Sequence, residues 1–482
     1  MIDVRPVGYV IGMLVAALGI TMLLPLLADM IEARGEGATF AVAALVTVVS
    51  GGTMALACMS GRDPGLTLQQ IFLLTTGTWL ALPLFGALPF WIGAPGVSYT
   101  DAFFEAMSGF TTTGATVLVR LQDLPAGTLL WRGMMQWFGG VGMIVVALAF
   151  LPALRVGGMQ IFRSEAFDTG GKILPRAGEI AVSISVIYLA LTVACMIAYS
   201  WAGMAFLDAL VHAMTTLATG GMANHDLSFG AYPAAAEYVG ALFMIIASLP
   251  FVLYLYLMRG AAGPLLRDAQ VRGFLLLLVI VVGMLTAWQF WQLDSLPEAA
   301  FRAALFNAVS IITGTGYAST DYQLWGGFAV ATFFLIGLVG GCAGSTCCSV
   351  KIFRYQLLFA AIFTQVRRLQ SPHGLFVLRY DRKPVGDDVI NSVMAFFVMF
   401  YLSLAVLSVL LSLMGLDPVT AISGAAAALA NIGPGLGQII GPSGNYASLS
   451  PQVKWVLAFA MLLGRLELMS VFVLFSLAFW RR

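Results

Sequence analysis

The stretch NAVSIITGTGYASTDY, residues 307–322, decides the fold, because it places flexible, polar backbone inside an apolar chain. It holds two glycines, three threonines, two serines and an aspartate between two long apolar segments. The 482-residue chain is 60% hydrophobic and 10% charged, with a mean hydropathy of +0.93. Since a soluble domain carries about 25% charged residues, the composition predicts an integral membrane protein.

Charge and cysteine content exclude two other classes. A net charge of +1 lacks the basic excess typical of nucleic-acid binding, so no nucleic acid is expected as a partner. The cysteines show neither metal-ligand spacing nor a disulfide framework, and all lie in apolar segments. They are Cys58, Cys195, Cys342, Cys347 and Cys348. We expect reduced, buried thiols.

A window of about 20 residues finds ten apolar spans along the chain. They lie near 6–28, 38–60, 70–93, 130–154, 179–204, 235–258, 273–293, 327–362, 390–414 and 453–480. Four shorter apolar stretches, 101–112, 208–219, 303–314 and 420–431, lie between them. These are too short to cross a hydrocarbon core of about 30 Å, and each is followed by glycine, so each is a re-entrant candidate.

The four short stretches form an internal repeat. They align on Gly114, Gly221, Gly316 and Gly433. Every repeat has an alanine eight positions before its glycine and another alanine twelve positions before it. These are Ala106, Ala213, Ala308 and Ala425, and Ala102, Ala209, Ala304 and Ala421. Because residues four apart share a helix face, each stretch predicts a short helix with a small-residue stripe for close packing.

The repeats predict an all-α integral membrane protein with four pseudo-symmetric helix–pore-loop–helix repeats around one pore, plus two extra N-terminal transmembrane helices. The expected domains are a helix pair at 1–66 and pore repeats at 67–160, 161–266, 267–370 and 371–482. Irregular backbone survives at membrane depth only where it is buried in protein or lines a water-filled path. Four loops meeting on one axis would replace the hydration shell of a cation with carbonyl oxygens, assisted by the negative C-terminal ends of the short helices.

In combination these residues resemble the Trk/Ktr/HKT superfamily of potassium transporters, most closely its bacterial TrkH/TrkG branch, over essentially the whole chain. The motifs that carry the resemblance are SGFTTTGATV (108–117), SIITGTGYASTDY (310–322), GGCAGST (340–346), ALANIGPGLG (428–437) and GRLEL (464–468). The resemblance implies K⁺ as the transported ion, no organic cofactor in this chain, no enzymatic activity, and a multi-pass location in a bacterial inner membrane. It also implies a homodimer and a cytoplasmic nucleotide-binding ring of the TrkA type.

The resemblance assigns a selectivity filter to the four loops. The four aligned glycines match the filter glycines, and glycine at every one of these positions implies potassium rather than sodium. The carbonyls that would line the ion sites belong to Thr112, Thr113, Thr219, Gly220, Gly314, Thr315, Asn431 and Ile432. Because the ligands are main chain, the side chains can differ between loops, and discrimination against sodium is expected to be moderate.

Two gate elements are expected below the filter. The segment 340–349 interrupts a span, and in the family it is an intramembrane loop that obstructs the pore. Its predicted gate residues, with the lysine that follows, are Gly340, Gly341, Gly344, Ser345, Thr346 and Lys351. Cys347 and Cys348 replace the usual glycines and make the loop bulkier. A simple helix kink is the alternative interpretation.

Arg465, expected near the middle of the last span, is the second gate element, a role that the family gives to an arginine here. A positive charge facing the pore would repel potassium. Glu467 is expected to point elsewhere on the helix and to be a poor partner for it. The alternative is a structural ion pair between Arg465 and a carboxylate on another helix.

Orientation follows from the positive-inside rule. Sixteen lysines and arginines fall on one side of the predicted spans and five on the other, so the four loops enter from outside. The largest inner loops, 155–178 and 366–388, offer basic docking surfaces for a cytoplasmic regulator. Asp226 and Asp321 follow the filter on the outer side, where they either concentrate cations or are ordinary loop carboxylates.

The predicted function is potassium uptake through a gated, channel-like pore with a four-glycine filter. The alternative is an ion-coupled secondary transporter, a proton– or sodium–potassium symporter, with a midplane site. That architecture predicts two inverted repeats, whereas the four repeats here align in the same sense.

Overall fold

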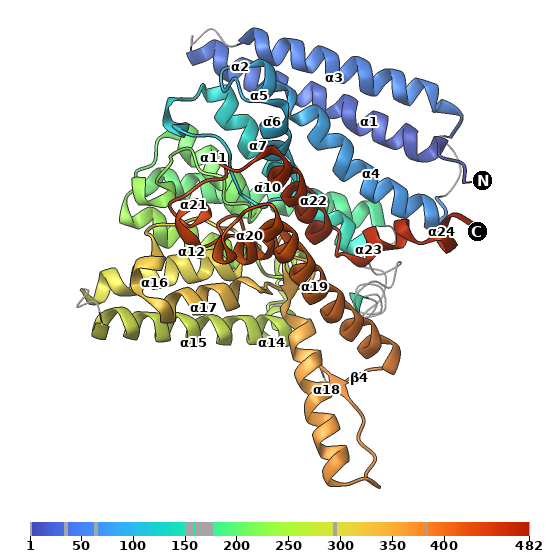
Figure 1. Ribbon diagram of the computed structural model, residues 1–482, viewed down its shortest axis with the longest axis vertical. Helices are drawn as coiled ribbons and strands as arrows, with labels where there is room; N and C mark the ends of the chain where they lie inside the picture. The colour runs from blue at the N-terminus through green and yellow to red at the C-terminus, as the bar shows by residue number, and fades with distance from the viewer. Residues whose placement is uncertain are drawn as a thin grey trace.

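The computed structural model describes residues 2–32, 37–61, 66–149, 158–159, 177–292, 296–381 and 383–481. Its regular structure is helical apart from two short strand pairings. The molecule has its long N-terminal helices on one side and α15–α17 on the other, with α20 and α22 between them (Figure 1). The predicted all-α membrane fold, four repeats preceded by two extra helices, is confirmed.

The two extra N-terminal helices pack closely against each other. α1 (Arg5–Thr21) continues into α2 (Leu23–Glu32), and α3 (Gly37–Ala57) runs beside them (Figure 1). A Cβ at Gly12 would lie 2.6 Å from the Ala55 nitrogen, so glycine permits this approach. Asp29 Oδ1 accepts a hydrogen bond from the Gly127 N–H at 2.5 Å, which fixes the pair to the first turn of α7 (Ala126–Ala149).

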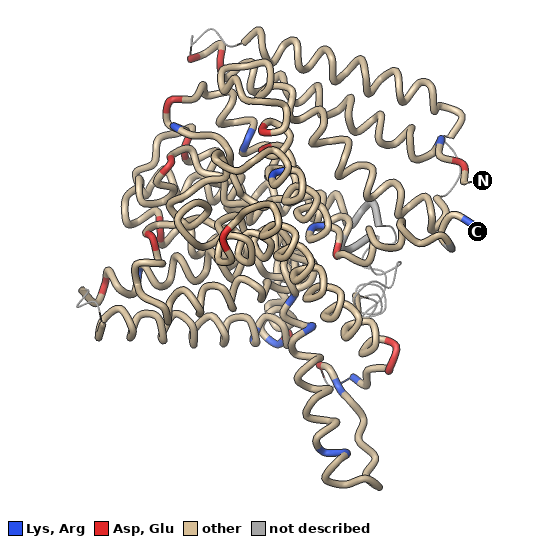
Figure 2. The backbone as a smooth tube through the Cα atoms, viewed as in Figure 1, with Lys and Arg blue, Asp and Glu red and all other residues tan. Residues whose placement is uncertain are grey.

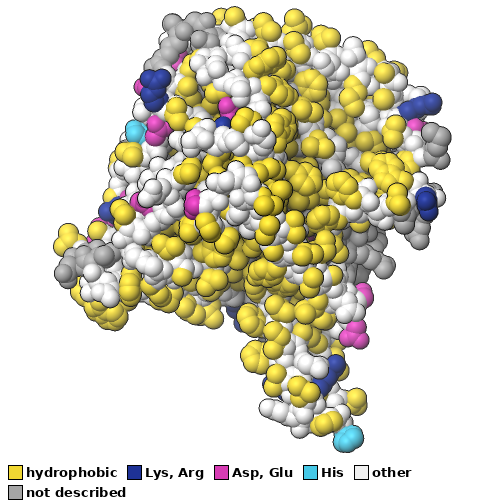
Figure 3. All heavy atoms as spheres, viewed as in Figure 1, with side chains coloured by type: hydrophobic (Ala, Val, Ile, Leu, Met, Phe, Trp, Pro, Cys, Tyr) yellow, Lys and Arg dark blue, Asp and Glu magenta, His cyan; other side chains and the backbone are white. Residues whose placement is uncertain are grey.

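Seven helical segments are long and apolar enough to cross a membrane within the described ranges, or nine spans if two bent pairs are included. The seven are α1–α2, α3, α4–α5 (Leu68–Gly86 and Leu88–Ile92), α7, α10 (Ala177–Trp201), α15 (Ala269–Gln292) and α19 (Asp387–Leu413). The bodies of α1, α3 and α15 are almost free of charge, and apolar side chains cover most of the face in view (Figures 2 and 3). This surface suits contact with lipid.

All four predicted short helices are present. They are α6 (Tyr99–Phe110), α11 (Phe206–Leu217), α16 (Pro297–Ile312) and α20 (Pro418–Ala430). The helices that follow them are α7, α12 (Ala234–Ala247), α17 (Gly327–Gly337) and α22 (Pro451–Arg465). The eight alanines of the two predicted columns are at most 1% exposed, so the small-residue faces are indeed packing surfaces.

Two spans that were expected to be continuous are broken. After α12, Ser248, Leu249 and Pro250 redirect the chain by 94° into α13 (Phe251–Met258). Pro250 explains this break because proline cannot donate the helical hydrogen bond. After α22 the chain turns by 105°, where Glu467 (φ 57°) and Leu468 (φ 38°) leave the helical region. Arg465, expected in mid-helix, is therefore the last residue of its helix.

The span 327–362 is also interrupted, as predicted. α17 ends before β1 (Val339–Gly340), which pairs in parallel with β2 (Val350–Lys351) and closes the neck of the intramembrane loop 341–349. The chain then enters α18 (Ile352–Gln370), which projects from the bundle (Figure 1). A hairpin of β3 (Arg379–Tyr380) and β4 (Lys383–Pro384) leads back to α19.

The remaining helices are short. They are α14 (Gly263–Arg267), α21 (Gly437–Ile440), α23 (Met469–Phe472), α24 (Leu477–Arg481), and the 3₁₀ turns η1 (Met59–Gly61), η2 (Leu121–Asp123), η4 (Ser228–Ala231), η5 (Tyr322–Trp325) and η6 (Val473–Phe475).

The predicted docking loop 366–388 begins in the projecting end of α18, continues through the segment 371–378 to the hairpin, and ends in the first turn of α19. Of the other predicted docking loop, 155–178, only residues 158–159 and 177–178 are described, so that prediction lies largely outside the described residues.

The cysteine prediction is confirmed with one correction. All five thiols are free, and four of them are buried. Cys58 is only partly buried, because it follows the end of α3.

Candidate functional site

The four short helices end in the same backbone arrangement, which forms four glycine loops: 112–114, 219–221, 314–316 and 431–433, here loops 1 to 4. In loop 1 the Thr112 N–H bonds to the Gly109 carbonyl (3.0 Å), and the Thr113 N–H bonds to the Ser108 carbonyl (2.9 Å). The equivalent pair of bonds recurs in the other three loops. This is the Schellman pattern of a helix C-terminus, which requires a left-handed residue.

The left-handed residue has the same place in every loop, two positions before the loop glycine. The four are Thr112 (φ 52°), Thr219 (49°), Gly314 (72°) and Asn431 (52°). Glycine and asparagine tolerate this conformation, whereas a β-branched threonine adopts it only against strain. Strained backbone clusters at functional sites, so Thr112 and Thr219 mark this region.

The four loop glycines are themselves left-handed, with φ between 74° and 99°. A Cβ at Gly114 would collide with the carbonyl oxygen of Gly220 in loop 2. A Cβ at Gly221 would likewise collide with the carbonyl oxygen of Thr315, and one at Gly316 with that of Ile432. A Cβ at Gly433 would lie 2.7 Å from the carbonyl oxygen of Thr113. Each loop therefore contacts the next, and loop 4 returns to loop 1. The loops form one closed ring, with the predicted carbonyl-bearing residues in it.

Side chains outside the ring fasten the segments that leave it. Buried Glu105, on α6, accepts hydrogen bonds from Arg132 Nε (2.8 Å) and from the Val117 N–H (2.9 Å). Arg132 also donates to the Ala223 carbonyl at 2.7 Å, so the pair joins the segments after loops 1 and 2. In repeat 3, Asn307 occupies the position that aligns with Glu105. Its Nδ2 donates to Ser319 Oγ, and its Oδ1 accepts the Ser319 N–H.

Two of the five cations counted on the outer side of the predicted spans, Arg132 and Lys454, are buried in the protein. Arg132 is 1% exposed and Lys454 is 4% exposed, because each is paired inside the protein. Lys454 Nζ lies 2.5 Å from Asp101 Oδ1. Sequence reasoning missed Glu105 and Arg132 as a pair, although a carboxylate within an apolar stretch is a signal for a buried partner.

Loops 4 and 1 are also joined by polar side chains. Asn431 Nδ2 donates to Thr113 Oγ1 at 2.9 Å and to the Met461 carbonyl at 2.9 Å. The Tyr446 hydroxyl donates to the Gly433 carbonyl at 2.6 Å, and the backbone N–H of Tyr446 donates to the Thr116 carbonyl. These bonds close the seam between the last repeat and the first.

The intramembrane loop docks on the break between α12 and α13. The Cys342 N–H donates to the Ser248 carbonyl, and the Phe251 N–H donates to the Gly344 carbonyl, both at 3.0 Å. Thr346 Oγ1 donates to the Ala247 carbonyl at 3.1 Å and lies 3.3 Å from Thr219 Oγ1. The loop therefore reaches glycine loop 2 directly, which a simple kink would not do.

Arg465 joins the intramembrane loop to glycine loop 1. Its Nη1 donates to Thr112 Oγ1 (2.8 Å) and to Cys348 Sγ (2.5 Å), and its Nη2 donates to the Gly139 carbonyl (2.6 Å). The side chain is fully buried. None of these partners is a carboxylate, so the structural ion pair weighed above is not what holds it.

Glu467 pairs with Arg354, the third residue of α18, and this pair is buried. The expectation that Glu467 is a poor partner for Arg465 agrees with this arrangement, but its actual partner was missed because the break after α22 redirects it. Lys351 is 1% exposed, and its Nζ donates to the Cys347 carbonyl at 2.5 Å. The end of the intramembrane loop is thus held by two buried cations, Lys351 at Cys347 and Arg465 at Cys348.

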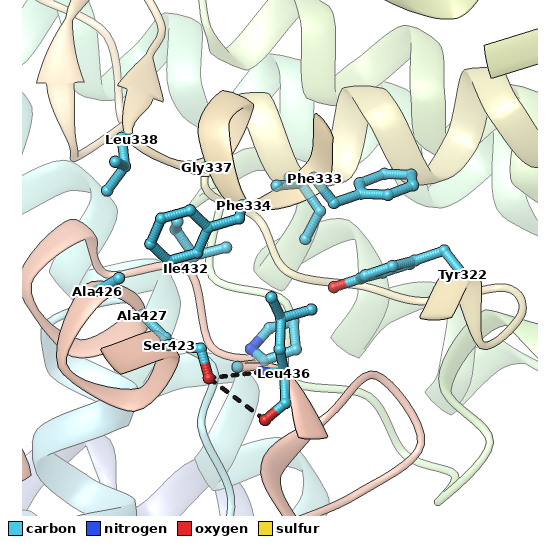
Figure 4. A pocket seen from close by; sticks show the side chains of 13 residues that line it. Tyr322, Phe333, Phe334, Gly337, Leu338, Ser423, Ala426, Ala427, Ile432 and Leu436 are labelled. Carbon is cyan, nitrogen blue, oxygen red and sulfur yellow. Dashed lines mark hydrogen bonds between the residues drawn. The ribbon is translucent and has the colours of Figure 1, made fainter. Parts of the chain in front are cut away.

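Loop 4 packs against apolar side chains of α17. A cavity of about 30 Å³ lies between α17 and α20, with Phe333, Phe334 and Ile432 among its lining side chains (Figure 4). Ser423 Oγ accepts the Leu436 N–H at 2.9 Å. The cavity has room for about two water molecules.

The outer aspartates brace backbone. Asp226 accepts hydrogen bonds from the N–H groups of Arg120 (2.9 Å) and Leu121 (3.0 Å), and Asp321 accepts one from Gln323 (3.0 Å). Both carboxylates therefore have a structural role in the segments that follow the glycine loops.

Comparison with known proteins agrees with this architecture. The TrkH family model, described as a cation transport protein, matches residues 39–481. The potassium uptake protein TrkI of Halomonas elongata is 45% identical over 479 residues, covering 99% of this chain and 97% of TrkI. TrkH of Escherichia coli K12 is 35% identical over 485 residues, covering 99% of each chain.

Among solved structures, the crystal structure of the potassium transporter TrkH from Vibrio parahaemolyticus matches with a TM-score of 0.92 and 32% identity over 100% of both chains. Like its bacterial relatives, this is a multi-pass protein of the inner membrane. The extent of these matches shows that the chain belongs to the TrkH family of cation transport proteins.

Proposed function

We propose that this protein takes up potassium through a gated, channel-like pore whose selectivity filter is the ring of four glycine loops. The observation that carries the proposal is the closed cycle in which every loop glycine faces the carbonyl of the next loop. The potassium uptake named for the relatives TrkI and TrkH supports the choice of ion. The function is transport and requires no catalytic step.

The ion ligands in this proposal are main-chain oxygens. They belong to the residues at the two positions before each glycine: Thr112, Thr113, Thr219, Gly220, Gly314, Thr315, Asn431 and Ile432. Such oxygens replace the hydration shell of a monovalent cation. The C-terminal ends of α6, α11, α16 and α20 meet at the ring and add negative potential. The membrane potential supplies about 2.3 kcal/mol per charge per 100 mV to drive entry.

The proposed gate consists of the intramembrane loop and Arg465. The loop residues Gly340, Gly341, Gly344, Ser345 and Thr346 are buried, as is Lys351 at the loop neck, and Thr346 lies beside Thr219 of loop 2. Arg465 holds loop 1 and Cys348 together. A unit charge 4 Å from an ion matters by about 4 kcal/mol at an effective dielectric of 20, so this guanidinium opposes a cation until it moves.

The proposed regulator is a cytoplasmic nucleotide-binding ring of the TrkA type, acting on a homodimer of this chain. Arg367 and Arg368 close the last turn of the projecting α18, and Arg379 and Lys383 lie on the hairpin that follows. This is an exposed basic surface suited to an acidic partner. The division into a helix pair, 1–66, and repeats at 67–160, 161–266, 267–370 and 371–482 belongs to the same proposal.

The second candidate is a proton- or sodium-coupled symporter. The two bent spans favour it, because broken helices build the midplane sites of such transporters. The closed ring favours the pore, because it comes from four loops of equal backbone geometry in the same sense along the chain.

Rubidium uptake into liposomes that contain the purified protein tests the proposal. Gly316→Ser is the decisive variant, because its Cβ would meet the Ile432 carbonyl in a left-handed residue. We expect rubidium uptake by the parent chain and a loss of uptake or of preference over sodium in the variant. Uptake that ignores this substitution would overturn the filter assignment.

A further inference from the structure

One buried side chain breaks the equivalence of the four loops. Gln136, on α7, is fully buried and stands beside loop 2. Its Nε2 donates to the Gly220 carbonyl at 2.6 Å, and its Oε1 accepts the Met222 N–H at 3.1 Å. The amide thus grips loop 2 on both sides of Gly221.

The orientation of this amide is determined by its partners. An amide oxygen only accepts and an amide nitrogen only donates, so the reverse orientation would place oxygen against the Gly220 carbonyl and nitrogen against an N–H. Glycine at residue 220 leaves room for this amide, since a Cβ there would lie 2.5 Å from Gln136 Oε1 and 2.7 Å from Nε2 and would displace it. The equivalent residues of the other loops carry side chains: Thr113, Thr315 and Ile432.

The Gly220 carbonyl is one of the four that close the ring, because it faces Gly114. Within the described residues no side-chain donor is seen for the equivalent carbonyls of Thr113, Thr315 and Ile432. One of four quasi-equivalent ligands is therefore anchored from outside, and three are not.

We propose that Gln136 is a specificity-determining residue, which biases the filter toward potassium over sodium by anchoring the Gly220 carbonyl. This rests on the proposed filter. Two effects act in the same direction. Sodium is smaller, so its ligands must move inward, and this carbonyl cannot follow without lengthening its bond to Gln136. The hydrogen bond from Gln136 also weakens the electrostatic field of the Gly220 oxygen. Oxygens with a weaker field compensate less well for the dehydration free energy of sodium, which is larger than that of potassium.

The test is the potassium-to-sodium permeability ratio of the purified full-length chain, from reversal potentials in planar bilayers and paired fluxes in liposomes. Gln136→Met keeps the length and removes the donor. We expect the ratio to fall about fivefold, the factor that corresponds to about 1 kcal/mol for one hydrogen bond, with potassium flux retained. Gln136→Glu is a second variant of the same shape, in which a carboxylate replaces the donor and strengthens the field; we expect at least as large a fall.

The matched control is Gln289→Met, a buried glutamine on α15 whose amide faces the Ala300 carbonyl rather than a glycine loop. Its ratio is expected to stay at the parent value. Unchanged ratios in both Gln136 variants, with Gly316→Ser altered, would overturn the role of Gln136 and leave the filter standing. Unchanged ratios in all three variants would overturn the filter itself.

Discussion

Arg465 Nη1 lies 2.5 Å from Cys348 Sγ, so a thiol of the intramembrane loop holds the guanidinium that also binds loop 1 at Thr112. The two proposed gate elements, the intramembrane loop and Arg465, are thereby in direct contact. A thiol here supplies an acceptor that a glycine would not.

Replacing Cys348 with glycine is expected to open the pore more often. The change removes one hydrogen bond from a charged donor, worth about 1 kcal/mol because a thiol sulfur accepts weakly, so we expect about a fivefold rise in regulator-free rubidium uptake. Cys347→Gly is the neighbouring control, because the Cys347 thiol contacts Ser248 instead. Equal rises in the two variants would assign the effect to a looser loop rather than to Arg465.

Glu467→Gln is expected to destabilise the protein strongly. It removes the carboxylate paired with buried Arg354 and leaves a buried charge less compensated, which costs about 3–5 kcal/mol. Thermal unfolding in detergent measures this loss. Glu298→Gln breaks a solvent-exposed pair with Arg302 and should leave the unfolding temperature close to that of the parent. If the two variants lose similar stability, the buried pair is not an important restraint.

Gly221→Ala is expected to reduce uptake strongly without loss of protein from the membrane. Its φ of 74° disfavours alanine, and the new Cβ would collide with the Thr315 carbonyl. We expect rubidium uptake to fall by about tenfold or more, because a destabilisation of the ring by more than about 1.4 kcal/mol corresponds to at least a factor of ten. Gly283→Ala, on α15, meets no atom within 4 Å and serves as the control with normal uptake.

Asp417 caps the pore helix α20 by accepting the Thr420 N–H at 3.0 Å, and hydrogen bonding with Thr420 lowers the pKa of this carboxyl. A lowered folded-state pKa means that the cap stabilises fully above the ordinary aspartate pKa of about 3.9 and is lost as pH falls through the lowered value. Asp417→Ala should therefore cost about 1 kcal/mol at neutral pH, and the difference from the parent should shrink in acid.

Thermal unfolding at several pH values measures this dependence. Asp417→Asn keeps a capping oxygen and does not titrate, so its stability should not show this acid-dependent change. A cost of Asp417→Ala that stays constant down to the lowest pH would contradict the role of the charged cap.

The four-repeat order could be predicted because it depends on local rules. Glycine register and alanines four residues apart are visible in the letters alone, and the alanines are buried as expected. The break after Ala247 had a signal in Pro250, which a 20-residue hydropathy window averages away. The break at Glu467 had none, because its left-handed residues are not glycine or asparagine.

Hydrogen bonds and ion pairs between residues far apart in the chain could not be predicted from the sequence. Gln136 and Glu105 are polar residues in apolar segments, which signals a buried partner. Nothing local says that the partner of Gln136 lies in loop 2 or that a partner of Glu105 lies after loop 1. The pairing of Arg354 with Glu467 joins residues 113 positions apart and depends on the angle of a broken helix.

The ring of glycine loops is made by one polypeptide, and this separates it from pores assembled from identical subunits. In a pore of identical subunits, a substitution appears in every subunit at once. Here Gly220 accommodates Gln136 while Thr113, Thr315 and Ile432 keep side chains at the matching places. Evolution can therefore adjust one wall of this passage independently, and preferences among cations can drift in small steps.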